Sequence, residues 1–227
     1  MKAMILAAGR GERMRPLTHT TPKPLLMAGG QCLIEYHLFA LARQGIRDVV
    51  INLSWLGRQI SDYLGNGRRY GLHIRYSEEG ETPLETAGGI IQALPLLGED
   101  PFLLVNGDIY TEFDFASLPT LTTTDAHLVM VNNPEHHPQG DFALSGDRLA
   151  LHGDKLTYSG IGIYAPRLFA QLERGIRPLA PILREAIARG AISGQHYTGE
   201  WWDVGTPERL GQLDRFLRHK QTAGHDG

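Results

Sequence analysis

The segment LAAGRGERMRPLTHTTPKPL, residues 6–25, contains the residue types that bind an anion. Gly9 and Gly11 follow an apolar run and allow the backbone to turn with positive φ, which exposes consecutive amides to a phosphate. Arg13 adds a forked guanidinium that matches phosphate oxygens. Lys23 stands between two prolines, so a chain of reduced freedom holds its charge. The spacing predicts a phosphate-binding loop, against the alternative of a solvated surface loop.

Two familiar phosphate-binding motifs do not account for this segment. A P-loop requires GxxxxGK[ST], and the sequence does not contain that pattern. The dinucleotide fingerprint requires a third glycine, where this chain has Met14, and a helix directly after the glycines. Pro16, Pro22 and Pro24 exclude a continuous helix there. The anion site is therefore predicted to be of another kind.

Two aspartates are candidates for a metal site. Asp108 follows the apolar run 102–105, at the carboxyl end of a predicted strand, where open α/β sheets bind ligands. Asp203 lies in WWDVGT, ahead of the last predicted helix. Taken alone, each aspartate is equally well explained by a turn or a helix cap. Nucleotide transfer would need such carboxylates on a hard cation that bridges phosphates.

The histidines and the single cysteine are not predicted to take part in the chemistry. His136 and His137 lie in the proline-flanked stretch NPEHHPQG, which is typical of a surface loop. Cys32 has no evident base partner, so a catalytic thiol is not expected. A lone cysteine also cannot form an internal disulfide, which favours a reducing cytoplasm.

Composition indicates an ordinary globular protein rather than a nucleic-acid or membrane protein. The 227 residues include 22 basic and 25 acidic side chains, a net charge of −3 that gives no general reason to bind nucleic acid. No apolar run approaches the roughly 18 residues of a membrane span, and the first run is too short for a signal peptide. We expect no nucleic-acid partner, no membrane partner and a cytoplasmic location.

Apolar runs alternate with helical patterns through the first half of the chain. The predicted strands are 3–7, 49–53, 73–77, 102–105 and 128–131, and the predicted helices are 33–44, 57–64 and 86–94, with Thr86 as a cap for the last. This alternation predicts an α/β fold with a mostly parallel sheet and helices on both faces. The first and fourth strands should then be adjacent, which places the glycine loop and Asp108 across one crevice.

The second half changes character. Residues 133–158 are rich in turn residues, and short alternating runs around Ser145-Gly146-Asp147 predict antiparallel hairpins in a small lobe. A strand is predicted at 161–164, and helices at 179–189 and 206–219, the last capped by Thr206. No linker or internal repeat divides the chain, so one domain over residues 1–227 is predicted.

The same residues resemble a known enzyme family. GRGERMRPLTHTTPKPLL, residues 9–26, resembles the GxGxRMxPLTxxxPKPL signature of sugar-1-phosphate nucleotidyltransferases. The similarity continues through LETAGG, LLVNGD, SGIGIY and WWDVGTPERL, at residues 84–89, 103–108, 159–164 and 201–210. It implies a single Rossmann-like, GT-A-like domain without the carboxy-terminal β-helix of longer relatives. Residues 1–110 would form a nucleotide-binding half and 111–221 a sugar-binding half, followed by a tail at 222–227.

The resemblance also implies residue roles. Arg13 would hold the outgoing pyrophosphate, Lys23 would hold the α-phosphate and the sugar phosphate, and Asp108 with Asp203 would bind Mg²⁺ as cofactor. The implied nucleotide-binding residues are Ala7, Ala8, Gly9, Gly11, Arg13, Lys23, Glu79, Glu85 and Gly88. The implied sugar-binding residues are Asn106, Gly140, Asp141 and Gly160. Lys155 does not match the Glu-Lys-Pro motif of longer relatives, so it receives no role.

The implied reaction is attack by a sugar 1-phosphate on the α-phosphorus of a nucleoside triphosphate. Similarity in length and sequence to the short bacterial uridylyltransferases of peptidoglycan recycling favours UTP and N-acetylmuramate α-1-phosphate as the substrates. Transfer of guanylyl, thymidylyl or cytidylyl groups to mannose, glucose or heptose 1-phosphate stays open. A catalytically silent nucleotide-sugar sensor also stays open, although the presence of Arg13, Lys23, Asp108 and Asp203 argues against it. A glycosyltransferase would need Asp-x-Asp where this chain has Asn106-Gly107-Asp108. We expect a monomer or a small homo-oligomer.

Overall fold

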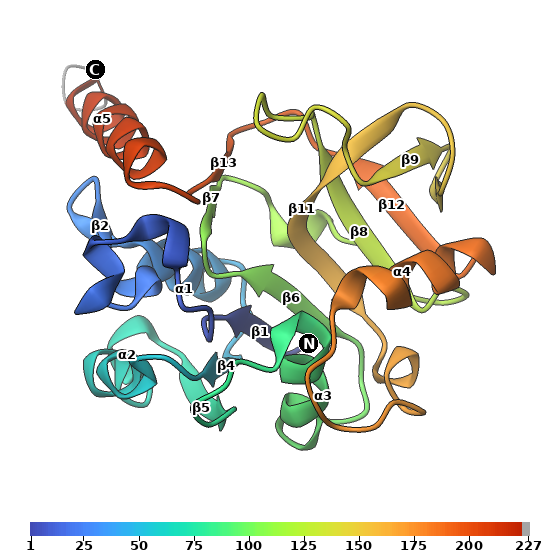
Figure 1. The fold of residues 1–227 in the computed structure, drawn as a ribbon, viewed down its shortest axis with the longest axis horizontal. Helices are drawn as coiled ribbons and strands as arrows, with labels where there is room; N and C mark the ends of the chain where they lie inside the picture. Colours follow the sequence, from blue (N-terminus) through green and yellow to red (C-terminus); the bar gives the residue numbers. More distant parts are fainter. Residues whose placement is uncertain (224–227) are drawn as a thin grey trace.

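A nine-stranded sheet forms the centre of the computed structural model, which describes residues 1–223 (Figure 1). The order of the strands across the sheet is β5-β4-β1-β6-β11-β8-β12-β10-β9. Their bounds are β1 Ala3–Leu6, β4 Asp48–Leu53, β5 His73–Glu78, β6 Phe102–Asn106, β8 Ala126–Val131, β9 Phe142–Ser145, β10 Arg148–Ala150, β11 Lys155–Tyr164 and β12 Ile192–His196. Two small sheets pair β2 (Met27–Ala28) with β3 (Gln31–Cys32) and β7 (Ile109–Thr111) with β13 (Trp201–Asp203).

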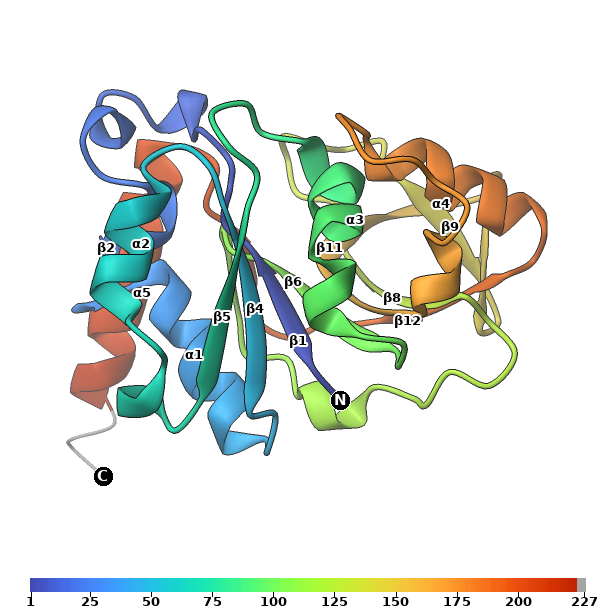
Figure 2. The same ribbon diagram turned by 90° about the horizontal axis from the view of Figure 1, so that it is seen from below.

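Helices cover both faces of the sheet, as the sequence predicts. The helices are α1 Leu33–Arg43, α2 Gly57–Leu64, α3 Glu85–Leu97, α4 Leu179–Ala188 and α5 Pro207–Ala223. Because side chains alternate along a strand, Ile5 of β1 joins the core beneath α1 and α2, whereas Met4 joins the core beneath α3 and α4. Figure 2 shows α3 beside α4 on one side of the sheet, and α1 and α2 on the other.

The prediction of a mostly parallel sheet is correct for only part of it. Strands β5, β4, β1 and β6 are parallel, and β1 lies directly beside β6 as predicted. Beyond β6 the sheet is mixed, because β11 runs antiparallel to both β6 and β8. The predicted hairpin exists as β9 and β10, but it extends the main sheet instead of forming a separate lobe. Between β6 and β11, a stretch that the structure describes throughout, the chain forms no α-helix, so these neighbouring strands are not joined by the helical crossover typical of parallel neighbours.

Several boundaries differ from the predicted ones. The N-cap of α3 is Leu84 and the helix begins at Glu85, so Thr86 is inside the helix and does not cap it. The predicted cap of α5 is confirmed, since the Arg209 amide donates to Thr206 Oγ1 at 3.3 Å. The first two residues of the predicted tail, 222–223, belong to α5, and the other four lie outside the described residues. Strand β12 and the pair β7–β13 were not predicted, because ISGQH and WWD lack an alternating apolar pattern.

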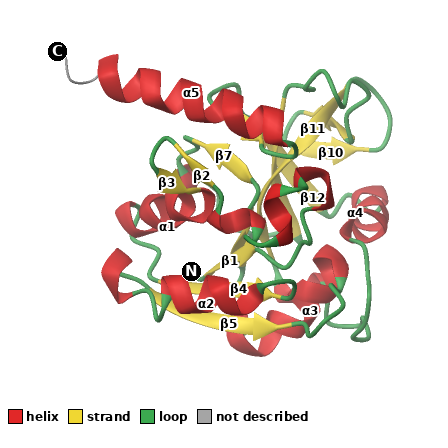
Figure 3. Cartoon of the chain, turned by 60° about the vertical axis from the view of Figure 1, so that its left-hand side comes forward, coloured by secondary structure: helices red, strands yellow, loops and turns green. Residues whose placement is uncertain are grey.

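The C-terminal helix returns to the N-terminal half of the chain. In Figure 3, α5 lies against β2, and Leu213 and Leu217 share a buried cluster with Met14 and Leu33. This packing brings the β13–α5 connection, and with it Asp203, back to the glycine loop. Within residues 1–223, no helix combines the length and apolar character that crossing a bilayer requires.

Strand β11 contains an irregularity beside β6. Its register against β8 shifts between Tyr158 and Ile161, and Gly160 in this interval has φ +82°. A Cβ atom at Gly160 would lie 2.6 Å from Cγ of Asn106 at the end of β6. Only glycine therefore fits at this bulge without moving Asn106.

We expect Gly160→Ala to be more destabilising than Gly146→Ala. Both glycines have positive φ, so each alanine should cost about 1–2 kcal/mol from the left-handed backbone alone. A Cβ at Gly146 has no neighbour within 4 Å, whereas the one at Gly160 collides with Asn106, which should add about 1–3 kcal/mol. Urea unfolding of the two variants measures the difference, and equal losses would contradict it.

Candidate active site

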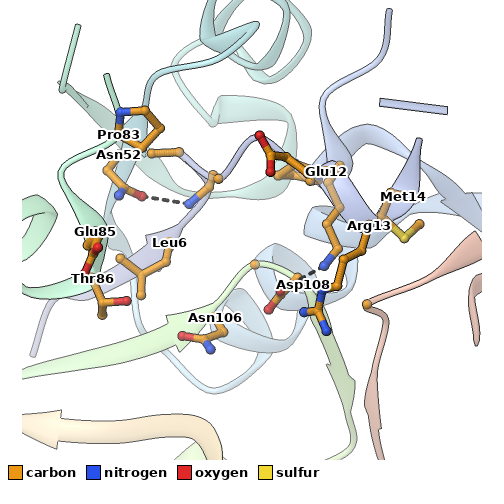
Figure 4. Close-up of a pocket in the computed structure, with 18 of the residues that line it drawn as sticks. Leu6, Glu12, Arg13, Met14, Asn52, Pro83, Glu85, Thr86, Asn106 and Asp108 are labelled. Atoms are coloured by element: carbon orange, nitrogen blue, oxygen red, sulfur yellow. Dashed lines mark hydrogen bonds and ion pairs between the residues drawn. The ribbon is translucent and has the colours of Figure 1, made fainter. Parts of the chain in front are cut away.

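The carboxyl ends of β1, β4 and β6 open into a cavity of about 420 Å³. Figure 4 shows Arg13 and Asp108 at one end of this cavity and Asn52, Glu85 and Thr86 at the other. Of the residues implied for the nucleotide, those that line it are Ala7, Ala8, Gly9, Gly11, Arg13, Lys23, Glu79 and Glu85. A cavity at this edge of the parallel strands is where open α/β sheets bind ligands.

The glycine loop is folded back on itself instead of continuing as a helix. Its prolines leave three separate 3₁₀ turns, Glu12–Met14, Leu17–His19 and Lys23–Leu25. Gly11 has φ +61°, and its carbonyl accepts a hydrogen bond from the buried hydroxyl of Thr18 at 2.7 Å. A Cβ at Gly11 would lie 2.9 Å from the methyl group of Thr18. This glycine is therefore required for the loop to close over Thr18.

Lys23 is held in place by Asp108. Its side chain is only 9% exposed, and Nζ donates to Oδ2 of Asp108 at 2.8 Å. Asp108 sits just beyond the end of β6, and its side chain is 39% exposed, so one face of the carboxylate is open to the cavity. A buried ammonium must be paired to be tolerated, so this contact aims the Lys23 charge at the cavity.

Strand pairing places the second aspartate beside the backbone of Asp108, although Asp203 itself does not line the cavity. Asp203, at the end of β13, is paired with Ile109 of β7, and the next amide, of Val204, donates to the Asp108 carbonyl at 3.0 Å. The two aspartates thus lie on adjoining backbone segments. Two carboxylates suit Mg²⁺, which takes one or two protein ligands together with phosphates and water. Within the described residues, no group of three or more His, Cys, Asp or Glu side chains is arranged to hold a metal, so phosphates would complete the coordination.

Two residues that the sequence analysis did not assign hold Asp203. Arg209 Nη1 lies 2.6 Å and His136 Nε2 lies 2.9 Å from Asp203 Oδ2. His136 is exposed in a loop, as predicted, and its contact with Asp203 ties this loop to β13. Its neighbour His137 contacts Asp141 at 3.1 Å instead. Arg209 lies in TPERL at the start of α5, six residues after Asp203. This short distance along the chain was the only indication in the sequence that the two side chains could meet.

Asn52 forms a bridge that the sequence analysis also missed. Its Oδ1 accepts from the Ala7 amide at 2.7 Å, and its Nδ2 donates to Glu79 Oε1 at 2.6 Å. Glu79 Oε2 accepts from the Leu84 amide at 2.7 Å. Both carboxylate oxygens of Glu79 are thus engaged within the protein, and burial raises the pKa of this group. Glu79 lines the cavity but also ties the loop between β5 and α3 to β4 and, through Asn52, to the residue after β1. The sequence did hint at such a role, because Asn52 is the one polar residue in the apolar run 49–53.

The helix α3 contributes Glu85 and Thr86 to the cavity, but not Gly88. Glu85 has φ +59°, a strained conformation for a residue with a side chain, at the start of the helix. Gly88 is buried away from the cavity lining, and its amide donates to the Arg177 carbonyl at 3.1 Å. A Cβ at Gly88 would lie 2.3 Å from the Gly175 carbonyl oxygen. The structure therefore places Gly88 where segment 175–177 packs on α3.

The residues implied for the sugar are only partly brought together. Asn106 lines the first cavity and a second one, of about 430 Å³, that Asp141 also lines. Gly160 lies against Asn106, which is the residue that both cavities share at the end of β6. Gly140 does not line either cavity, and it packs closely on the Leu156 carbonyl.

A neutral histidine lies behind the catalytic end of the sheet. His37 of α1 is buried, and burial lowers its pKa to about 4, with opposing contributions from the Ile109 backbone and Asp108. The ring is thus uncharged near neutral pH and adds no positive charge behind Asp108.

Comparison with known proteins agrees with this geometry. The chain is 54% identical over 220 residues to the N-acetylmuramate alpha-1-phosphate uridylyltransferase of Neisseria meningitidis serogroup B, covering 92% of this chain and 95% of that protein. It is 34% identical over 223 residues to the enzyme of the same name from Caulobacter vibrioides, covering 91% and 92%. Among solved structures, the inositol-1-phosphate CTP transferase from T. maritima has a TM-score of 0.79 at 18% identity, over 96% of this chain and 95% of that one, which is a likeness of fold.

A family model described as nucleotidyl transferase matches residues 2–143, more than half of the chain. That stretch contains the glycine loop, Lys23 and Asp108, which line the cavity together with Arg13. The chain belongs to the nucleotidyl transferase family.

Proposed function

We propose that this protein transfers the uridylyl group of UTP to N-acetylmuramate α-1-phosphate, giving UDP-N-acetylmuramate and pyrophosphate in peptidoglycan recycling. The observation that carries the chemistry is the buried Lys23 paired with Asp108 beside the glycine loop. The choice of base and sugar is supported by the 54% identity to a uridylyltransferase of that name along nearly the whole chain. A cytoplasmic location fits such a reaction, because its triphosphate donor is a cytoplasmic metabolite.

The reaction needs no covalent nucleophile in the protein. An oxygen of the sugar phosphate attacks the α-phosphorus of UTP in line, the new P–O bond forms, and the bond to the β-phosphate oxygen breaks, releasing pyrophosphate. The attacking phosphate is already largely ionised near neutral pH, since its second pKa is about 6. Catalysis then depends on positioning the phosphates and neutralising their charge.

The residues at the phosphate end of the cavity have the chemistry for that task. Lys23, fixed by Asp108, supplies a point charge for the α-phosphate and the incoming sugar phosphate. Arg13 lines the same cavity and has the forked donors to bind the departing pyrophosphate. Asp108 and Asp203 would hold Mg²⁺, which when bound neutralises charge on the phosphates. His136 and Arg209 orient Asp203 for that role.

Substrate identity is tested by a pyrophosphate-release screen. We expect the highest kcat/KM with UTP and N-acetylmuramate α-1-phosphate, compared with GTP, dTTP and CTP and with mannose, glucose and heptose 1-phosphates. Turnover of another pair at a higher kcat/KM would replace the proposed substrates. Absence of turnover with every pair, despite UTP binding, would favour the catalytically silent sensor.

Replacing Lys23 by Met should lower kcat/KM by roughly 10²–10³-fold, the usual effect of removing one donor that stabilises the transition state. UTP should still bind, because the amides of the glycine loop are unchanged. Lys220→Met is the matched control, since Lys220 is also paired with a carboxylate, that of Glu112, but does not line the cavity. Steady-state kinetics and UTP titration separate the two effects. A Lys23→Met variant with full turnover would refute the assignment.

The metal is tested by chelation and by titration. EDTA should abolish turnover and added Mg²⁺ should restore it, and Asp203→Asn should raise the Mg²⁺ concentration for half-maximal rate at least about tenfold. Asp154→Asn is the control, because Asp154 is exposed and lies outside the cavity. Equal Mg²⁺ requirements for Asp203→Asn and the control would contradict a ligand role for Asp203.

A further inference from the structure

The second cavity adjoins the first one at Asn106 and at the start of α3. It shares Glu85, Thr86 and Asn106 with the first cavity, so a ligand can extend from one into the other. Phe142 and Leu183 give it apolar walls, on the side of the sheet covered by α4. An acceptor whose phosphate lies beside Lys23 would therefore place its sugar ring and substituents here.

One cation lines this second cavity. Arg184, on α4, is exposed, and its guanidinium lies 5.7 Å from the centre of the Phe142 ring. Among the described residues it makes no ion pair, unlike Arg167 and Arg189 on the same side of the molecule, which both contact Asp125. Its forked donors are thus available to a ligand.

The acidic residues of the cavity do not compete for Arg184. Asp141 is occupied on both oxygens, since Oδ2 accepts from the Tyr158 amide at 2.8 Å and Oδ1 contacts His137 Nε2 at 3.1 Å. Glu85 lies where the two cavities meet, at the start of α3. The cavity therefore has its negative charge near the first cavity and near His137, and its positive charge on α4.

The acceptor of the proposed function carries two anionic groups. One is the 1-phosphate, and the other is the carboxylate of the lactyl ether that distinguishes a muramate from a glucosamine. With the phosphate at Lys23, the carboxylate belongs in the second cavity. A guanidinium binds a carboxylate through two parallel hydrogen bonds, so it recognises both charge and planar shape.

We propose that Arg184 binds the lactyl carboxylate of the acceptor and so selects a muramate over the corresponding glucosamine. This inference rests on the proposed function. Arg184 is exposed, so its guanidinium stays hydrated when the bound sugar lacks the carboxylate. Binding of such a sugar therefore does not bury an unpaired charge. Selection therefore comes from a favourable contact with the right sugar, and not from rejection of the wrong one.

The test compares two acceptors that differ in the lactyl group. We expect Arg184→Met, which keeps an unbranched apolar stem but removes the guanidinium, to lower kcat/KM for N-acetylmuramate 1-phosphate roughly 10- to 100-fold, the effect of losing a charged hydrogen bond. For N-acetylglucosamine 1-phosphate the change should be less than about threefold. Arg184→Lys, which keeps the charge without the fork, should fall between wild type and Arg184→Met. Calorimetric Kd values replace kcat/KM where turnover of the glucosamine is too slow.

Two controls distinguish the loss of this contact from a loss of stability and from a general loss of positive charge on α4. Arg189→Met also removes a cation at the end of α4, but Arg189 does not line either cavity, and it should leave both acceptors unaffected. The shift in melting temperature on adding UTP should be unchanged in Arg184→Met. Equal losses for both acceptors, or equal losses in Arg189→Met, would overturn the role of Arg184 and leave the proposed function intact. Wild-type protein that uses another sugar phosphate but not the muramate would overturn both.

Discussion

The ion pair between Lys23 and Asp108 is the contact on which the site depends. It joins the end of the glycine loop to the end of β6, two segments that are far apart in sequence and meet because β1 and β6 are neighbours. An ammonium group with a side chain only 9% exposed cannot stay buried without such a partner. The pair therefore holds the loop closed and, at the same time, presents a fixed positive charge to the cavity.

A second polar bridge sets the opposite end of the cavity. Asn52 links the Ala7 amide to Glu79, and Glu79 in turn holds the Leu84 amide just before α3. Every polar group in this bridge has a partner, which is the condition for a buried network to stabilise a structure. Its consequence is that the loop after β1 and the loop between β5 and α3 are both tied to β4 at this end of the cavity.

The mixed half of the sheet gives the cavity its second compartment. Antiparallel β11 brings Gly160 against Asn106, and α4, which packs on β10 and β12, places Arg184 over the Phe142 ring. The pairing of β13 with β7 then carries Asp203 back beside Asp108. The residues around the first cavity thus come mainly from the parallel half, whereas those around the second cavity come mainly from the chain that follows it.

The sequence by itself determined the glycine loop with its prolines, the position of Asp108 just beyond β6, and the strand–helix alternation with β1 beside β6, because these depend on local spacing and on apolar periodicity. It placed helix bounds within a few residues for the same reason. Only the tertiary structure decided that Arg209 and His136 hold Asp203, that Glu79 is engaged by the protein itself, and that the sheet is mixed. Those outcomes depend on which distant strands pair and on where short strands without an alternating pattern, such as β12 and β13, pair, and no local pattern along the chain encodes such contacts.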